Sequence, residues 1–205
     1  MECRGAPWYK QHMKISANSS LLLISLLLCG CGLQAGFPEA FKEKNGVNTP
    51  AVIGKKIFLT ESTFTGNFGG VAMADAQCAE DRQNPDTGIF RALVVDGTNR
   101  ISTPGQAVDW VLKPSQIYTR LDGTVIGTTN ASALFTLPLV SPISATPAPV
   151  WTGLSTGWAI GSHCERWKNP AATGNSGEAS STTATAFFGP AAACNLSLKI
   201  ICVQQ

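Results

Sequence analysis

The chain has 205 residues, of which 44% are hydrophobic, with 15 Lys and Arg against 13 Asp and Glu. This length allows one globular domain with a substantial core, plus a short extension. Residues 1–30 hold three of the basic residues and one of the acidic ones, so the rest of the chain is formally neutral. A neutral chain lacks the basic surface of a nucleic-acid binder, and we expect no nucleic-acid partner.

The segment 1–30 is predicted to be a signal peptide. Lys10 and Lys14 supply positive charge ahead of an apolar run over residues 21–28. That run is too short to cross a bilayer comfortably and is typical of a secretory signal. Met13 is a more natural start than Met1, because the charged region follows it directly.

The apolar run ends in Leu28-Cys29-Gly30-Cys31, where a small residue precedes a cysteine. This pattern resembles the bacterial lipobox, so we expect cleavage before Cys31 and a diacylglycerol on its sulfur. Cys29 is an alternative anchor, and an ordinary signal peptide with incidental cysteines is an alternative interpretation. The first interpretation predicts an exported lipoprotein held on a bacterial membrane, at the outer membrane or cell surface.

Residues 31–54 are polar and broken by glycine and proline, and they are predicted to be a flexible tether. A globular domain is expected over residues 55–205. Its expected elements are a strand at 55–60, a loop at 65–70, a helix at 71–82, a central strand at 90–95, a short helix or strand at 108–112, a hairpin over 117–126 around Asp122-Gly123, and loops at 137–149 and 173–185.

The last strand is predicted from clean alternation over residues 196–203. Leu196, Leu198, Ile200 and Cys202 fall on one face of it. After the signal peptide the unmodified cysteines are Cys78, Cys164, Cys194 and Cys202. Four cysteines allow three disulfide connectivities, and the sequence alone does not choose among them. They contain no C-x-x-C or C-x-x-H pair, so a zinc site is not expected.

Several motifs occur in an order that resembles the C-type-lectin-like fold, and within it the endostatin (collagen non-collagenous) branch. They are Ala74-Asp75-Ala76-Gln77-Cys78, Trp151-Thr152-Gly153-Leu154, Cys164-Glu165-Arg166-Trp167 and Ile200-Ile201-Cys202. The chain also resembles a family of spirochaete lipoproteins of unknown function. The resemblance covers roughly Lys55 to the C-terminus.

This resemblance implies an α+β fold, with a mostly antiparallel sheet and one or two helices. It also implies two nested disulfides, Cys78–Cys202 and Cys164–Cys194, and core positions for Trp151, Gly153, Leu154 and Trp167. The carbohydrate motifs of calcium-dependent lectins, Glu-Pro-Asn or Gln-Pro-Asp and then Trp-Asn-Asp, are missing. We therefore expect no calcium site and no other metal or cofactor.

No catalytic residues are predicted. His163 is the only histidine after the signal peptide, and its neighbour Ser162 would point to the opposite side of a strand. The candidate ligand-binding residues are Trp158, Arg166, Lys168 and Asn169, with Trp158 expected to be the most exposed tryptophan. The arginines are scattered in sequence, at 82, 91, 100, 120 and 166.

The sequence therefore favours a membrane-anchored lipoprotein whose lectin-like domain binds an extracellular protein or glycan without calcium. One alternative is a structural envelope lipoprotein without a diffusible ligand. A second is a hydrolytic enzyme using His163, which the absence of a nucleophile motif disfavours.

Overall fold

A computed structural model gives the structure of the protein over residues 53–205. The predicted signal peptide, the lipidation site Cys31 and the tether up to residue 52 lie outside these residues. The described part is mostly β-sheet, with two α-helices and two disulfide bonds, which agrees with the predicted α+β class. Within it, no helix has the length and apolar character needed to cross a bilayer.

The main sheet has nine strands in the described part of the chain, and most neighbouring strands are antiparallel. Its order is β10 (Ala191–Ala193), β9 (Thr173–Glu178), β6 (Pro149–Trp151), β11 (Ser197–Gln204), β1 (Lys55–Leu59), β4 (Ile117–Thr119) and β5 (Val125–Thr128), with β2 (Phe64–Thr65) and β3 (Phe90–Ala92) also paired to β11. A second, two-stranded sheet joins β7 (Leu154–Ser155) to β8 (Ala159–Ile160).

The C-terminal strand β11 is the centre of this sheet, because four strands pair with it. β2 and β6 pair with its first half, and β1 and β3 pair with its second half. Residues 200–203 are fully buried, so the strand is covered on both faces. Leu196, which was expected on the buried face, is instead 50% exposed, because the strand begins only at Ser197.

Two hydrophobic cores lie on the two faces of β11. One, the large core, contains Ile201 and Val203 together with the side chains of β4 and β5. The other, the helix-side core, contains Ile200 and Cys202. The alternation of side chains along a strand explains this division, since neighbouring residues point to opposite faces. The alternation in the sequence predicted which residues lie on each face of β11. Only the face with Ile200 and Cys202 was expected to pack in a core.

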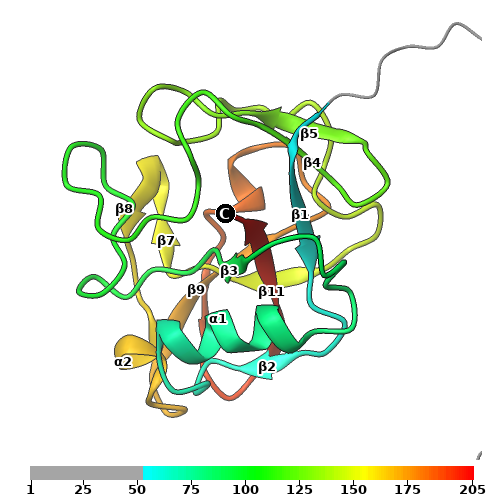
Figure 1. Cartoon of the computed structure of the whole chain (residues 1–205). Coiled ribbons are helices and arrows are strands. Elements are labelled where there is room, and N and C mark those ends of the chain that lie inside the picture. The colour runs from blue at the N-terminus through cyan, green and yellow to red at the C-terminus, as the bar shows by residue number, and fades with distance from the viewer. Residues whose placement is uncertain (1–52) are drawn as a thin grey trace, which may run out of the picture. The chain divides into compact units, whose positions relative to one another are not determined.

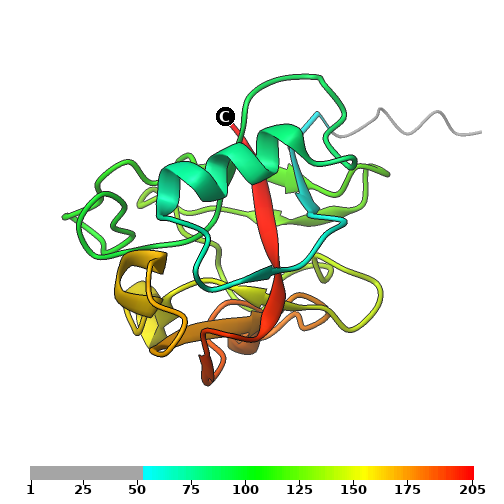
Figure 2. The same ribbon diagram turned by 90° about the horizontal axis from the view of Figure 1, so that it is seen from below.

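Helix α1 (Val71–Glu80) covers the helix-side core. Val71, Ala74 and Cys78 are its buried residues, as their helical spacing predicted. Figures 1 and 2 show the helix lying against β11, and the Cys78–Cys202 disulfide joins the two elements. The second bond, Cys164–Cys194, encloses a much shorter segment of chain. Both disulfides are the pairs that the family resemblance implied.

The second helix, α2 (Cys164–Trp167), is a single turn in which every residue has a positive φ, between 50° and 63°. Hydrogen bonds still join residues four apart in this turn. The N–H of Trp167 donates to His163 O at 2.8 Å, and the N–H of Lys168, just after the turn, donates to Cys164 O at 2.9 Å. A left-handed turn of non-glycine residues is unfavourable, so neighbouring contacts must hold it. The Cys164–Cys194 bond and the buried Trp167 side chain provide them. Two short 3-10 turns, η1 (Thr156–Trp158) and η2 (Ala184–Ala186), complete the elements.

The prediction of a loop over residues 173–185 was wrong for its first half. Thr173–Glu178 forms β9, which pairs with β6 on one side and β10 on the other. The small residues that indicated a loop are needed for close packing. A Cβ on Gly177 would lie 2.3 Å from Ala186 O, and one on Gly174 would lie 2.7 Å from the sulfur of Cys164.

Two other expected elements also differ. Residues 108–112 form neither a helix nor a strand, apart from an isolated bridge between Val108 and Ile101, although Trp110, Val111 and Leu112 are buried. The expected central strand at 90–95 is regular only over β3, and β11 takes the central place. In contrast, the hairpin around Asp122-Gly123 is confirmed, because β4 and β5 are antiparallel neighbours.

Replacing Gly153 by alanine should lower the free energy of unfolding by about 3 kcal/mol, the sum of a left-handed backbone cost and an overpacking cost. Gly153 has a φ of +69°, and a Cβ would lie 2.6 Å from Val95 O and 2.9 Å from Trp167. Gly157→Ala is the matched control, because its φ is +72° and nothing lies within 4 Å. Equal losses in urea denaturation of the two variants would contradict the packing explanation.

Candidate functional site

Two of the scattered arginines are used to hold the fold together. The Arg100 side chain is fully buried and binds Asp75 through two hydrogen bonds of 2.8 and 2.9 Å. It also reaches Asp109 at 2.9 Å and donates to Ala92 O at 2.7 Å. Arg91 pairs with the same two aspartates from a more exposed position. This network links α1 to the loop after β3 and leaves neither guanidinium free for a ligand.

The charges in this network also change the acidity of its aspartates. Burial by itself would raise the pKa of Asp75, but hydrogen bonds and charge attraction from Arg100 outweigh it, so the pKa lies below its ordinary value. For Asp109 the hydrogen bond from Arg91 is the main cause of a lowered pKa. Both groups therefore stay ionised at neutral pH as structural partners of the arginines.

The predicted ligand residues are not brought together as a single site. Trp158, expected to be exposed, is only 6% exposed and belongs to the large core. Its ring lies 4.9 Å from the ring of Phe187 and 5.0 Å from that of Phe188. Trp158 is the last residue of η1 and has a φ of +65°. The prediction of an exposed tryptophan was therefore wrong.

Arg166 and Lys168 do share a cavity, here called the basic pocket, of about 320 Å³ at the N-terminus of α1. Its other lining residues are Gly69, Gly70, Val71, Ala72, Asp96 and Asn99. Both basic side chains are exposed to solvent. Asp96 accepts hydrogen bonds from the backbone of residues 98–100, so it serves the loop rather than the cavity. Asn169, the fourth predicted residue, accepts a hydrogen bond from the N–H of Ala171 and is absent from the pocket lining.

His163 is occupied by the left-handed turn that follows it. Its Nδ1 atom accepts a hydrogen bond of 2.9 Å from the N–H of Arg166. That contact caps α2 and fixes the orientation of the ring. Within residues 53–205 no group of three His, Cys, Asp or Glu side chains is arranged to hold a metal ion.

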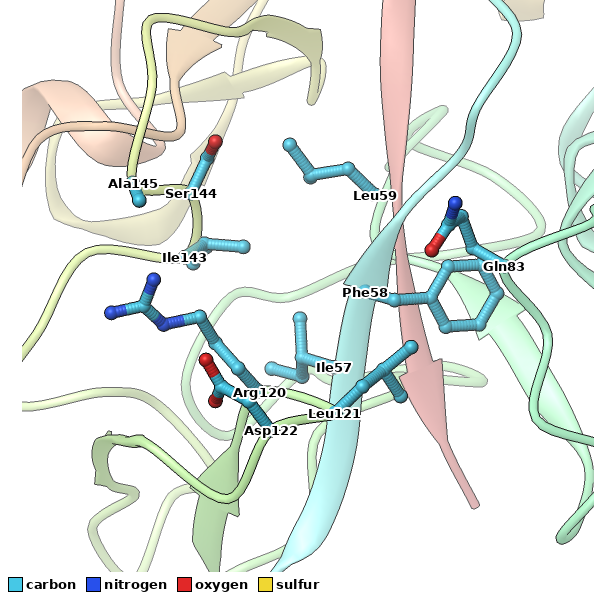
Figure 3. A pocket seen from close by; sticks show the side chains of 10 residues that line it. All are labelled: Ile57, Phe58, Leu59, Gln83, Arg120, Leu121, Asp122, Ile143, Ser144 and Ala145. Atoms are coloured by element: carbon cyan, nitrogen blue, oxygen red, sulfur yellow. The ribbon is translucent and has the colours of Figure 1, made fainter.

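A second cavity, here called the edge pocket, lies beside β1 and also has a volume of about 320 Å³. Figure 3 shows three walls around it: β1, the turn after β4 and the loop that carries Ile143. The lining residues are Ile57, Phe58, Leu59, Gln83, Arg120, Leu121, Asp122, Ile143, Ser144 and Ala145. Apolar side chains thus dominate two walls, and the charged groups come from the turn.

Arg120 differs from Arg91 and Arg100 because it forms no ion pair with a carboxylate in the described residues. The side chain is partly buried, and its Nε atom is buried without a hydrogen-bond partner in the described residues. Neither an ion pair nor a side-chain hydrogen bond joins the Arg120 guanidinium to another group in that part of the chain. A buried polar atom without a partner is rare in native proteins and calls for a functional or solvent explanation.

Asp122 forms no ion pair or hydrogen bond with Arg120, although charge attraction from Arg120 and Lys56 adds to the lowering of the pKa of Asp122. Its carboxylate accepts a 2.8 Å hydrogen bond from the N–H of Thr124, which is the main reason that the pKa of Asp122 is lowered. Lys56 brings a further positive charge to the turn, donating to Thr119 Oγ1 at 3.1 Å and to Arg120 O at 3.4 Å. The turn beside the edge pocket thus carries two cations and one anion, a net positive charge.

The pocket also borders an open stretch of sheet. β1 and β4 pair only as far as Lys56 and Thr119, and the chain then turns away through residues 120–122. β1 continues to Leu59, paired with β11 along its other edge. Among the described residues, no strand pairs with this side of β1 beyond Lys56. The edge pocket therefore offers backbone groups as well as an unpaired arginine.

Sequence reasoning missed the edge pocket. Arg120 was noted only as one of five scattered arginines, and the Asp122-Gly123 turn only as a hairpin signal. The available signal was an arginine two residues before Asp122. It could not be separated from Arg91 and Arg100 without knowing which carboxylates each one contacts.

The model of a protein family of unknown function, DUF1554, matches residues 61–185 of the chain. The chain belongs to the DUF1554 family. This match includes α1, the Arg120 turn and the left-handed turn α2, whereas β1, β10 and β11 lie outside it. The folded DUF1554 domain thus extends beyond the matched residues on both sides, since β11 is its central strand. No curated protein matches the chain significantly.

Proposed function

We propose that this DUF1554 protein is an exported, lipid-anchored binding protein, whose domain takes a protein or glycan ligand without calcium and without catalysis. The observation that carries the proposal is the unpaired Arg120 guanidinium in the edge pocket. Arg91, Arg100 and the nearby aspartates are held in structural pairs, and His163 caps a turn. Arg120 is a charge that a ligand can pair with.

We further propose a C-type-lectin-like domain of the endostatin branch. The two nested disulfides and the packing of the first helix on the last strand support it. Trp151 and Leu154 of the W-x-G-L motif are fully buried, and Gly153 has the positive φ that favours glycine. Trp167 is also buried and donates from Nε1 to Val95 O at 2.9 Å.

Lipidation at Cys31 is the first expected result of this proposal. Mass spectrometry of the mature N-terminal peptide should find an acylated Cys31, because the apolar run ends in a lipobox-like sequence. Such an anchor would place the domain on the bacterial outer membrane or cell surface, with the membrane as its first partner. A free amino terminus on a later residue would end this part of the proposal, and acylated Cys29 would move the anchor.

The absence of a calcium requirement gives a second expected result. Chelation should leave the melting temperature of the protein unchanged, because the usual lectin ligands for calcium are missing from the sequence. A ligand that binds only the folded state raises its stability. A rise of several degrees on adding millimolar calcium to chelated protein would therefore reveal a site that the proposal denies.

Ligand binding itself can be tested with the full-length chain in detergent micelles on peptide and glycan arrays. We expect binding that persists in the presence of chelator. Arg120→Gln should weaken it if the ligand lies in the edge pocket, and Arg166→Gln if the ligand lies in the basic pocket. The array contradicts the proposal if the folded chain binds nothing more than its heat-denatured form does. Turnover of an array substrate that His163→Ala abolishes would instead favour a hydrolytic enzyme.

A further inference from the structure

We propose that the edge pocket binds an extended acidic peptide, which pairs with the free edge of β1 and places a carboxylate on Arg120. This inference rests on the proposed binding function and specifies its ligand. The observations behind it are the unpaired strand edge, the apolar wall and the net positive charge of the turn, all of which meet at one cavity.

The backbone of β1 presents its free groups to the pocket side. The N–H of Thr60 donates to Ile200 O at 3.0 Å, so the backbone groups of Thr60 face β11. Backbone groups of successive residues in a strand face opposite edges, so the N–H and C=O of Leu59 face away from β11. Leu59 also lines the pocket. An extended peptide that lies in the pocket can therefore continue the sheet by pairing with Leu59.

The side chains around the cavity suit alternate residues of such a peptide. In Figure 3 the side chains of Ile57 and Leu59 extend from β1 toward the cavity, and Ile143 points toward them from the opposite wall. Every second residue of an extended peptide points to the same side. Ile57 and Ile143 are only 1% and 4% exposed in the large core, so an apolar side chain of the peptide would pack chiefly on the partly buried Leu59, as hydrophobic contact favours.

Charge selects an acidic residue in the peptide. The Nε atom of Arg120 is buried, so a carboxylate would pair with the two Nη groups, which have no hydrogen-bond or ion-pair partner in the described residues, and Lys56 donates to the backbone of the same residue. A carboxylate accepts two parallel hydrogen bonds from a guanidinium, and such charged pairs are stronger than hydrogen bonds between neutral groups. A glycan lacks the regularly spaced backbone N–H and C=O groups that strand pairing needs, and its hydroxyls would meet an aliphatic wall. These features favour a peptide over a glycan at this pocket.

The test uses the full-length chain in detergent micelles and a capped seven-residue peptide in which threonine and valine alternate, with glutamate in place of the middle valine. Its affinity is measured by calorimetry against a matched peptide that carries glutamine at the centre. We expect the glutamate peptide to bind about ten- to a hundredfold more tightly, as a charged hydrogen-bond partner implies. Arg120→Gln should remove that difference, and Arg166→Gln, in the basic pocket, should leave it unchanged.

Two modified peptides test strand pairing independently of charge. One is N-methylated at the even-numbered residues and the other at the odd-numbered residues, so that each loses the donors of one edge. Because alternate N–H groups face opposite edges, only one of the two should lose affinity, by about tenfold or more. An Arg120→Glu variant should reverse the preference and select a lysine peptide over the glutamate one. This reversal also shows that the variant is folded.

The outcomes separate this inference from the broader proposal. Equal affinity for the glutamate and glutamine peptides, or equal effects of the two methylation patterns, would overturn the peptide site. Binding of a sulfated glycan that Arg166→Gln abolishes, with no peptide binding, would also overturn it while leaving the binding function in place. If folded protein binds neither peptide nor glycan, both the inference and the proposed function fail.

Discussion

Replacing Cys78 and Cys202 together by alanine is expected to lower the free energy of unfolding by about 2–5 kcal/mol, as for native disulfides in small exported domains. The bond links residues 124 apart in sequence and joins α1 to β11. Both sulfurs are fully buried in the helix-side core. Their loss releases a long loop in the unfolded chain and removes the tie between the helix and the central strand.

The matched control is the double replacement of Cys164 and Cys194, whose separation is 30 residues. In the chain-entropy model this shorter loop is worth about 1 kcal/mol less. Its loss should also free the left-handed turn α2, which the bond holds, with a smaller effect on α1. Urea denaturation followed by circular dichroism measures both variants. A larger loss from the inner pair than from the outer pair would contradict this assignment.

Arg100→Met is expected to destabilise the domain by about 3 kcal/mol, because Asp75 loses two charged hydrogen bonds in a mostly buried place and keeps only those from Arg91 and the N–H of Ala92. The Arg100 side chain is fully buried and makes a two-bond contact with Asp75, which is 19% exposed. Methionine preserves much of the volume but none of the hydrogen bonds. Arg91→Met is the control, since Arg91 is 30% exposed and its pairs are more screened, so we expect about 1 kcal/mol or less.

The same network predicts how stability changes with pH. The pKa values of Asp75 and Asp109 are lowered in the folded protein, so their ion pairs contribute fully above the unfolded pKa of about 3.9. That contribution is lost as the pH falls through the lower folded pKa values. The stability difference between the native chain and Arg100→Met should therefore shrink at low pH. A difference that stays constant from pH 7 to pH 2 would contradict the role of these ion pairs.

Local patterns in the sequence were enough to predict the elements that local interactions determine. The spacing of Val71, Ala74 and Cys78 predicted the buried face of α1, and Asp122-Gly123 predicted the β4–β5 hairpin. The α+β class came from the family resemblance rather than from these elements. β9 was missed because its glycines indicate a loop by composition, whereas Gly174 and Gly177 are there to admit neighbouring atoms at short distance. Such close approaches depend on distant parts of the chain.

The candidate site was predicted less well than the fold. Trp158 was expected to be exposed because, unlike Trp151 and Trp167, it matches no core position of the resembled fold. In the structure Phe187 and Phe188, 29 and 30 residues further along, pack against its ring. Arg120 could not be recognised as an unpaired arginine, because whether an arginine has a carboxylate partner depends on residues distant in the sequence. Long-range packing decides both cases, and periodicity over a short window contains no information about it.

Amide hydrogen exchange at Leu59 tests the central claim most directly, namely that a ligand strand pairs with the edge of β1 at the edge pocket. The exchange rate is measured on the full-length chain with and without a saturating concentration of the glutamate peptide. We predict that the Leu59 amide exchanges at least tenfold more slowly when the peptide is bound, because it gains a hydrogen-bond acceptor, while the Phe58 and Thr60 amides, already turned toward β11, change little. An unchanged Leu59 amide in peptide-saturated protein, with new protection at Gly70 instead, would place the ligand in the basic pocket and contradict the account.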